Sequence, residues 1–216
     1  MTALDRLTRR RLLAIAASAV ALLAVGITVG VIRANDSGEQ SVWVDLEPPV
    51  AMPDAVLTDA SGAQFDLQER TTGRVTVLYF GYLNCVDVCP IHMDVLSDVV
   101  DTLEPEVRDQ IDVIFVTTDP ERDTPAALGE FLANFDASFI GLTGSARVLR
   151  DLQVAAGLPV AVAEPVGQDG SYVVGHATQV LVFGRDGVAR RAFPFGVRQT
   201  DWARVLPQIV EEGTGS

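Results

Sequence analysis

The chain alternates short apolar runs with longer amphipathic segments, a pattern typical of strands that alternate with helices. Val75–Phe80 and Asp112–Thr117 are rich in β-branched and aromatic residues, which predicts two strands buried on both faces. Two further apolar runs, Thr178–Phe183 and Val188–Phe193, flank Gly184-Arg185-Asp186-Gly187, a sequence that favours a tight turn. These last two runs therefore predict an antiparallel hairpin.

Helices are expected between these strands, with smaller elements around them. Pro90 fits the first turn of one helix, and Asp123 or Thr124 can cap another. The expected helices are Pro90–Leu103, Asp123–Asn134, Ala146–Ala156 and Asp201–Glu211. A small hairpin is expected from Ala55–Asp59 and Gln64–Leu67, and a short strand over Phe139–Leu142. The first strands alternate with helices and are expected to pair in parallel, and the chain then ends with a hairpin and a helix. This element order predicts an α/β domain with a thioredoxin-like fold.

A long uncharged run, Leu12–Ile32, precedes this pattern. As a helix it spans roughly 31 Å, about the thickness of a bilayer core. Four arginines precede the run, at 6 and 9–11, and only Arg33 follows it closely. This excess of positive charge before the run predicts that the N-terminus stays in the cytoplasm. The sequence therefore predicts a single-pass anchor in the cell membrane, with the following domain on the extracytoplasmic side.

Two other interpretations of this N-terminal segment compete with an anchor. A cleavable signal peptide has a shorter apolar region and a small-residue cleavage site, for which Ile32-Arg33-Ala34 is a poor match. Thr8–Leu13 also resembles a twin-arginine export signal. We expect residues 1–33 to form the cytoplasmic N-terminus and anchor, 34–54 a polar, proline-rich linker, and 55–212 the thioredoxin-like domain.

The composition excludes several classes of function. All 16 basic residues are arginines, so no lysine is present for a phosphate-binding loop or a Schiff base. Against 29 acidic residues they leave a formal net charge of −13, which disfavours binding to nucleic acid. Without residues 1–33, 11 arginines and 28 acidic residues remain, a balance that suits cationic partners or metal ions.

The only two cysteines, Cys85 and Cys89, lie between the first central strand and its helix. Ligands and reactive groups collect at this edge of an open α/β sheet, and a nearby helix N-terminus favours the thiolate form. At a spacing of four residues, both sulfurs can reach one soft ion from a single helical turn. A structural disulfide is the alternative, although it would close only a small loop and stabilise little.

His176 lies at the start of the strand that should neighbour the cysteine-bearing strand, at the same sheet edge. Two thiolates and one imidazole form a soft ligand set that suits Cu(I) and also binds Cu(II), so we expect one copper per chain. His92 follows Cys89 by three residues and is expected to be an exposed helix residue; as a fourth ligand it would give a zinc-type shell. Met93 is expected in the core.

Four segments of the chain resemble the Sco/SenC family of copper-binding assembly proteins. The first two together are highly specific to that family, and the resemblance covers about Pro53 to Val210. The segments are Y-F-G-Y-x-x-C-x-D-V-C-P over 79–90, T-D-P-E-R-D-T-P over 118–125, G-L-T-G over 141–144, and His176 ahead of a strand and a Gly-Arg-Asp-Gly turn.

The resemblance implies a membrane-anchored, thioredoxin-like domain that faces the periplasm or its equivalent. It also implies that Cys85, Cys89 and His176 bind one copper. The protein would then help to build the binuclear copper site of cytochrome c oxidase subunit II, its expected partner, with another copper carrier as a further candidate partner.

The chain departs from the family pattern at three places. Val86 stands where the family usually has proline, and Leu83-Asn84 replaces the usual Thr-His or similar pair. Gly175 stands where an acidic residue often precedes the histidine. If that acid orients the imidazole, this chain holds copper more loosely.

Two functions from different classes therefore stay open, a copper metallochaperone and a thiol-disulfide reductase that keeps the oxidase cysteines reduced. A peroxidase-like or structural thioredoxin-fold protein is a third alternative. Thioredoxin-type oxidoreductases have two residues between their cysteines and a cis-proline facing them, whereas this chain has three residues and no proline over 171–178. The two main functions differ at His176, because metal binding requires it and disulfide exchange does not.

Overall fold

A computed structural model describes residues 41–166 and 171–213 of the chain. These residues fall almost entirely within one compact unit, Val42–Ser216. The expected membrane anchor over 12–32 lies outside the described residues and stays a prediction. Within the described ranges, no helix is both long enough and apolar enough to cross a bilayer.

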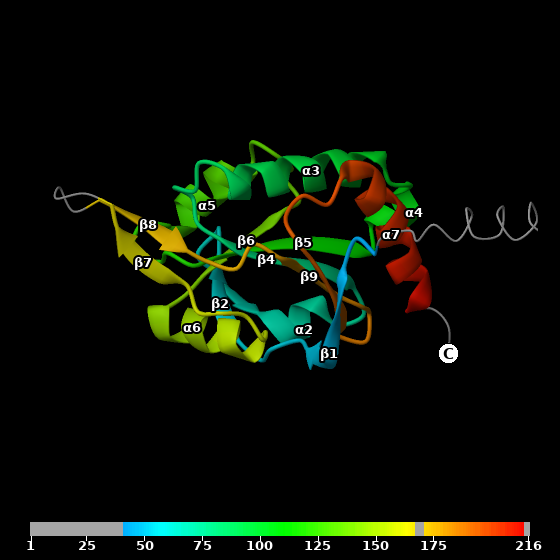
Figure 1. Cartoon of the computed structure of the whole chain (residues 1–216), viewed down its shortest axis with the longest axis horizontal. Helices are drawn as coiled ribbons and strands as arrows, with labels where there is room; N and C mark the ends of the chain where they lie inside the picture. The colour runs from blue at the N-terminus through cyan, green and yellow to red at the C-terminus, as the bar shows by residue number, and fades with distance from the viewer. Residues whose placement is uncertain (1–40, 167–170, 214–216) are drawn as a thin grey trace, which may run out of the picture. The chain divides into compact units, whose positions relative to one another are not determined.

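A mixed sheet of eight strands runs through the domain in the order β1-β10-β9-β4-β5-β6-β2-β3 (Figure 1). Parallel pairing joins β4 to β5 and β5 to β6, and the other neighbouring strands are antiparallel. The central pair is almost wholly buried, as the two apolar runs predicted. The strands are β1 (Val44–Ala51), β2 (Val56–Asp59), β3 (Gln64–Asp66), β4 (Val75–Gly81), β5 (Ile111–Thr117), β6 (Ile140–Thr143), β9 (Val180–Phe183) and β10 (Val188–Phe193).

Helices cover both faces of this sheet (Figure 1). The sheet therefore separates the core into two layers, one on each face. Met93 and Trp202 are buried in one layer, and Leu67 and Leu149 in the other. The first layer is covered by α3 (Val88–Thr102), α4 (Pro105–Arg108), α5 (Pro125–Leu132) and α7 (Gln199–Glu212). The second is covered by α2 (Leu67–Thr71) and α6 (Ala146–Ala155).

The expected hairpins, central strands and main helices are confirmed, with ends that shift by a few residues. The cap predicted for α5 is present, because Thr124 Oγ1 accepts a hydrogen bond of 3.2 Å from the backbone N–H of Ala127. Pro125 occupies the first turn of that helix, where its missing N–H removes no helical bond. The short helices α2 and α4 were not predicted.

A linker is expected over residues 34–54, but the structure has the strand β1 over Val44–Ala51. This part of the prediction is wrong. β1 pairs with β10 from Val44 opposite Ala192 to Ala51 opposite Val188. Its two prolines at 48–49 indicated a linker, but an edge strand has a partner on one side only and tolerates proline. The folded domain therefore begins near Val44 rather than at residue 55.

A separate two-stranded sheet was also not predicted. It consists of β7 (Val162–Pro165) and β8 (Tyr172–Gly175), which pair antiparallel and share no strand with the main sheet. In Figure 1 this β7–β8 arm projects beyond the main sheet. The chain leaves β8 directly into His176, so the arm carries one of the expected metal ligands.

Candidate metal centre

The two cysteines lie between the end of β4 and the first turn of α3. Cys89 is in the first turn of α3, whereas Cys85 precedes the helix, so the two do not share one helical turn as expected. Instead, the backbone N–H of Cys89 points to Cys85 Sγ at an N···S distance of 3.4 Å. The first N–H groups of a helix lack helical acceptors, and here a sulfur takes that role.

Gly81, the last residue of β4, leaves room for the buried sulfur. A Cβ atom at this position would lie 2.8 Å from Cys89 Sγ and 2.9 Å from the Phe115 ring. Contacts this short are repulsive, so any side chain at 81 would push the thiol or the ring aside. The glycine of the Y-F-G-Y sequence is thus required by the position of Cys89.

Three soft ligand atoms converge at this edge of the sheet. One ligand atom each from Cys85, Cys89 and His176 lies within 4.8 Å of the others, and Cys89 Sγ is 3.7 Å from His176 Nε2. The antiparallel pairing of β9 with β4 brings the start of β9 to the end of β4, as predicted. In the described part of the chain, this is the one cluster with metal-ligand geometry.

The imidazole of His176 is oriented by its own neighbourhood. Its Nδ1 lies 2.8 Å from the carbonyl oxygen of Ala177, so Nδ1–H donates and Nε2 is left with its lone pair toward Cys89. The rings of Tyr79 and Tyr82 meet the imidazole edge-on, with centroids 6.1 and 5.5 Å away. The carbonyl of Ala177 thus orients the ring from the side opposite the sulfurs.

Burial controls the protonation of the inner thiol. Cys89 is fully buried and 3.5 Å from the hydroxyl of Tyr79. This burial raises the pKa of the Cys89 thiol to about 12, which outweighs the hydrogen bonds that favour the thiolate. The expectation that the helix N-terminus makes this sulfur a thiolate is therefore wrong for Cys89 without a metal.

His92 is buried, which corrects the expectation of an exposed helix residue. Its Nε2 lies 2.8 Å from the carbonyl oxygen of Thr178, to which it donates, and its ring packs 4.6 Å from that of Tyr79. Burial lowers the pKa of His92, which keeps the ring neutral. The spacing to Leu96 and Val99 places residue 92 on the apolar face of α3, a signal that was available in the sequence. Its engaged Nε2 disfavours a zinc-type shell.

Other residues around the site had no role in the sequence analysis. Tyr79 belongs to a predicted strand and Tyr82 to the Y-F-G-Y sequence, and in the structure both rings pack on His176. The T-D-P-E-R-D-T-P sequence carried the family resemblance without a chemical role. In the structure its residues Asp119 and Arg122 form a partly buried ion pair next to the β7–β8 arm.

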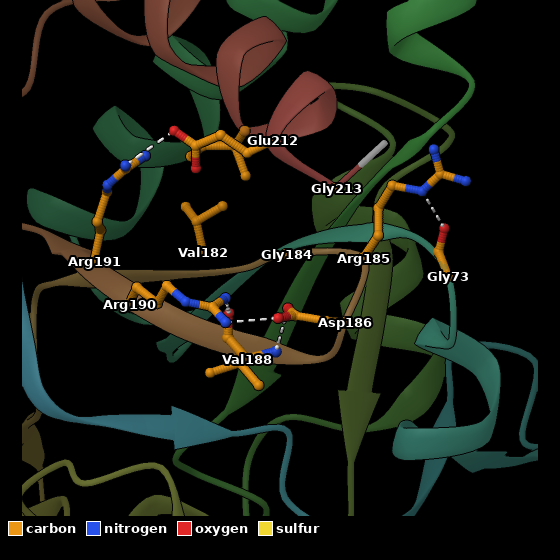
Figure 2. Close-up of a pocket in the computed structure, with 11 residues that line it drawn as sticks. Gly73, Val182, Gly184, Arg185, Asp186, Val188, Arg190, Arg191, Glu212 and Gly213 are labelled. Carbon is orange, nitrogen blue, oxygen red and sulfur yellow. Dashed lines mark hydrogen bonds and ion pairs between the residues drawn. The ribbon is translucent and has the colours of Figure 1, made fainter. Parts of the chain in front are cut away.

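A pocket of about 580 Å³ opens at the opposite end of the sheet (Figure 2). It is lined by Gly73, which precedes β4, and by ion pairs of Arg190 with Asp186 at 2.7 Å and Arg191 with Glu212 at 3.0 Å. None of the described residues that line it is a cysteine or a histidine, so it offers no soft ligand. The cluster of two cysteines and one histidine lies at the other end.

Comparison with known proteins agrees with this site. The family model described as SCO1/SenC matches residues 47–211. The chain belongs to the SCO1/SenC family. A Stutzerimonas stutzeri protein named for copper binding is 35% identical over 161 residues, 74% of this chain and 78% of that protein. The SCO2-like protein of Rickettsia typhi is 31% identical over 133 residues, 61% of this chain and 64% of the relative, so this match spans less than two thirds of its length.

Solved structures of SCO1/SenC proteins share the fold. Copper-bound ScoI of Bradyrhizobium japonicum is 28% identical, with a TM-score of 0.67 over 74% of this chain and 99% of that one. BsSco, described as having a disulfide switch and as a member of the Sco family of cytochrome c oxidase assembly proteins, is 19% identical. Its TM-score of 0.61 over 82% of this chain supports the thioredoxin-like fold alone.

Proposed function

We propose that this SCO1/SenC protein binds one copper ion through Cys85, Cys89 and His176. The observation that carries the proposal is the convergence within 4.8 Å of three soft donors, one of them 87 residues from the nearest cysteine. Two thiolates and an imidazole suit Cu(I) and also bind Cu(II). The copper-bound ScoI structure and the copper-binding relative support the same choice of metal.

We further propose that the copper is cargo for the binuclear copper centre of cytochrome c oxidase. Subunit II would be the receiver, and another copper carrier the donor. The half-buried sulfur of Cys85 favours this role, because an incoming ligand from a partner can reach a metal held there. Membership of the SCO1/SenC family supports it.

Thiol-disulfide reduction is the second candidate, favoured by the two free thiols. Cys85, the more accessible sulfur, would attack a partner disulfide as the thiolate, and Cys89 would then displace the partner from the mixed disulfide. The pair would become a disulfide, and the partner's two sulfurs would receive the two electrons and two protons. His176 has no part in this reaction.

The site of action belongs to the same proposal. The apolar run over 12–32 would anchor the chain as a single-pass protein of the cell membrane, with the copper-binding domain on the extracytoplasmic side. Cell fractionation should find the full chain in membranes, and protease added outside the cytoplasmic membrane should degrade the domain. A mature chain that starts near Asn35 and stays soluble outside the cytoplasm would contradict the anchor.

Copper binding is tested by titration of the full chain in mild detergent with Cu(I) against a chromophoric chelator. The wild type should bind one equivalent, and Cys85→Ser should lose most of the affinity. His176→Ala should lose more than the about 10- to 100-fold expected for a residue that only orients a ligand. His92→Phe is the matched histidine control and should keep wild-type stoichiometry. If His92→Phe loses as much affinity as His176→Ala, the ligand set is the zinc-type shell instead.

A further inference from the structure

The three ligands are supported by separate parts of the fold. Cys85 and Cys89 follow β4 of the main sheet, whereas His176 follows the β7–β8 arm, which forms a sheet of its own. On its C-terminal side His176 is followed by Thr178, to which His92 donates, and then by β9, so the arm fixes the histidine from its N-terminal side. Among the described residues of β8, only Val174 is buried, so apolar packing supplies a narrow attachment.

The turn over 119–123, between β5 and α5, binds the base of the arm. Tyr172, the first residue of β8, donates its hydroxyl to Asp119 Oδ1 at 2.8 Å. Arg122 Nη1 donates to the backbone carbonyl of Tyr172 at 3.2 Å, and the guanidinium lies 3.6 Å from the centroid of the Tyr172 ring. Because Arg122 Nε also pairs with Asp119, the two charged side chains hold one tyrosine through its hydroxyl, its ring and its backbone.

The same turn also binds the cysteine segment. Asp123 Oδ2 accepts a hydrogen bond of 3.1 Å from the backbone N–H of Leu83, two residues before Cys85. It also accepts one of 2.5 Å from the hydroxyl of Thr117, at the end of β5. The guanidinium of Arg122 lies 5.9 Å from the ring centroid of Tyr82, and that ring also meets the His176 ring edge-on.

We propose that the 119–123 turn is a clasp that sets the position of His176 relative to the two cysteines, with Arg122 as its central positioning residue. The inference rests on the proposed copper site. It gives a physical role to the T-D-P-E-R-D-T-P sequence, whose charged residues touch none of the three ligands directly. Arginine suits the role because its planar fork pairs with Asp119 and the Tyr172 carbonyl together while its face lies on the tyrosine ring.

The clasp predicts a specific dependence of copper affinity on His176. Without Arg122, the arm loses its charged attachment and the imidazole samples positions away from the sulfurs. Arg122→Ala should therefore weaken Cu(I) binding by about 10-fold, as expected for a residue that orients a ligand. In a His176→Ala chain, the same change should alter affinity by less than about twofold, because the ligand it positions is gone.

A double-mutant cycle on the full chain tests this dependence. The four chains are the wild type, Arg122→Ala, His176→Ala and the double variant, each titrated with Cu(I) against a chromophoric chelator. Nitrogen hyperfine structure in the electron paramagnetic resonance spectrum of the Cu(II) form provides an independent readout of imidazole coordination. It should weaken in Arg122→Ala and partly return in Arg122→Lys, which keeps the charge but not the fork.

Arg74→Ala is the matched control, since Arg74 forms a partly buried ion pair with Asp112 at the other end of β4. It should leave copper affinity unchanged. If Arg122→Ala does not fold, Tyr172→Phe takes its place in the double-mutant cycle, because it removes only the hydrogen bond from the hydroxyl to Asp119.

The outcomes separate the inference from the function on which it rests. An equal loss of affinity with and without His176, or no loss at all, contradicts the clasp and leaves the copper site standing. If His176→Ala alone binds Cu(I) as tightly as the wild type, His176 is not a ligand, and both the proposed site and the clasp are wrong.

Discussion

The buried sulfur of Cys89 makes copper binding depend on pH. Burial raises the pKa of its thiol to about 12, so without metal this sulfur is protonated at neutral pH. Copper binds the thiolate, and the proton must leave when the ion enters. Below the pKa, higher pH removes the competing proton, so affinity for Cu(I) should rise at least about tenfold per pH unit between pH 6 and 8.

Chelator competition at a series of pH values measures this slope, after correction for protonation of the chelator itself. Proton release on loading, followed with a pH indicator in weak buffer, gives a second measurement. An affinity that stays constant across this range would mean that Cys89 does not bind as the thiolate.

Gly81 provides a second prediction for a single residue. Gly81→Ala places a methyl group 2.8 Å from Cys89 Sγ, so the chain should lose about 1–3 kcal/mol of unfolding free energy and bind copper less tightly. Gly144→Ala is the control, since its Cβ would lie 3.2 Å from Leu57, away from the metal ligands. Urea unfolding and copper titration of both variants should show a loss of affinity for Gly81→Ala alone.

How much of the site could be predicted differed from residue to residue. Cys85, Cys89 and His176 are rare residue types placed by element order at one sheet edge, and the structure brings their ligand atoms together. Tyr79 and Tyr82 carry no such signal, because an aromatic residue near a strand end is equally compatible with plain core packing. The raised pKa of Cys89 also depends on how deeply three-dimensional packing buries the thiol, which spacing does not determine.

Among the elements, β4 and β5 could be predicted because strands buried on both faces are continuous apolar runs. The edge strand β1 and the β7–β8 arm could not. Most residues of these strands are exposed, so no apolar alternation marks them, and their pairing depends on partners distant in sequence. The arm matters most, because it leads directly into His176.

His92 joins two elements and makes the stability of the fold depend on pH. It lies on α3 and donates to Thr178 just before β9, and burial lowers its pKa. The unfolded chain then takes up a proton at pH values where the folded chain does not. This contribution to stability is complete above the unfolded pKa of about 6.5 and is lost as pH falls toward the lower pKa of the folded state.

His92→Phe keeps a ring against Tyr79 but cannot titrate. Urea unfolding of the metal-free chains between pH 5 and 7.5 should show that the wild type loses more stability than His92→Phe as pH falls. At pH 7.5 the variant should be less stable by about 1 kcal/mol, because the Thr178 carbonyl loses its donor. Parallel curves for the two chains would contradict a titrating His92.

For the whole molecule, His176 distinguishes the two proposed functions. His176→Ala should impair assembly of the oxidase copper centre in cells under copper limitation, while the Cys85–Cys89 pair stays oxidisable and reducible. Added copper should partly restore assembly by mass action. Oxidase activity of the variant strain is compared with that of a His92→Phe strain. Normal activity of the His176→Ala strain under limitation would favour the thiol-disulfide reductase.

The difference in burial between the two sulfurs has a kinetic consequence. Cys89 is 0% exposed, while Cys85 is only partly covered. A bulky maleimide should therefore alkylate Cys85 well before Cys89 in the metal-free chain. In the proposed copper transfer, a partner's sulfur would meet the same asymmetry. It would replace Cys85 before Cys89, which would give the transfer a fixed direction across the site.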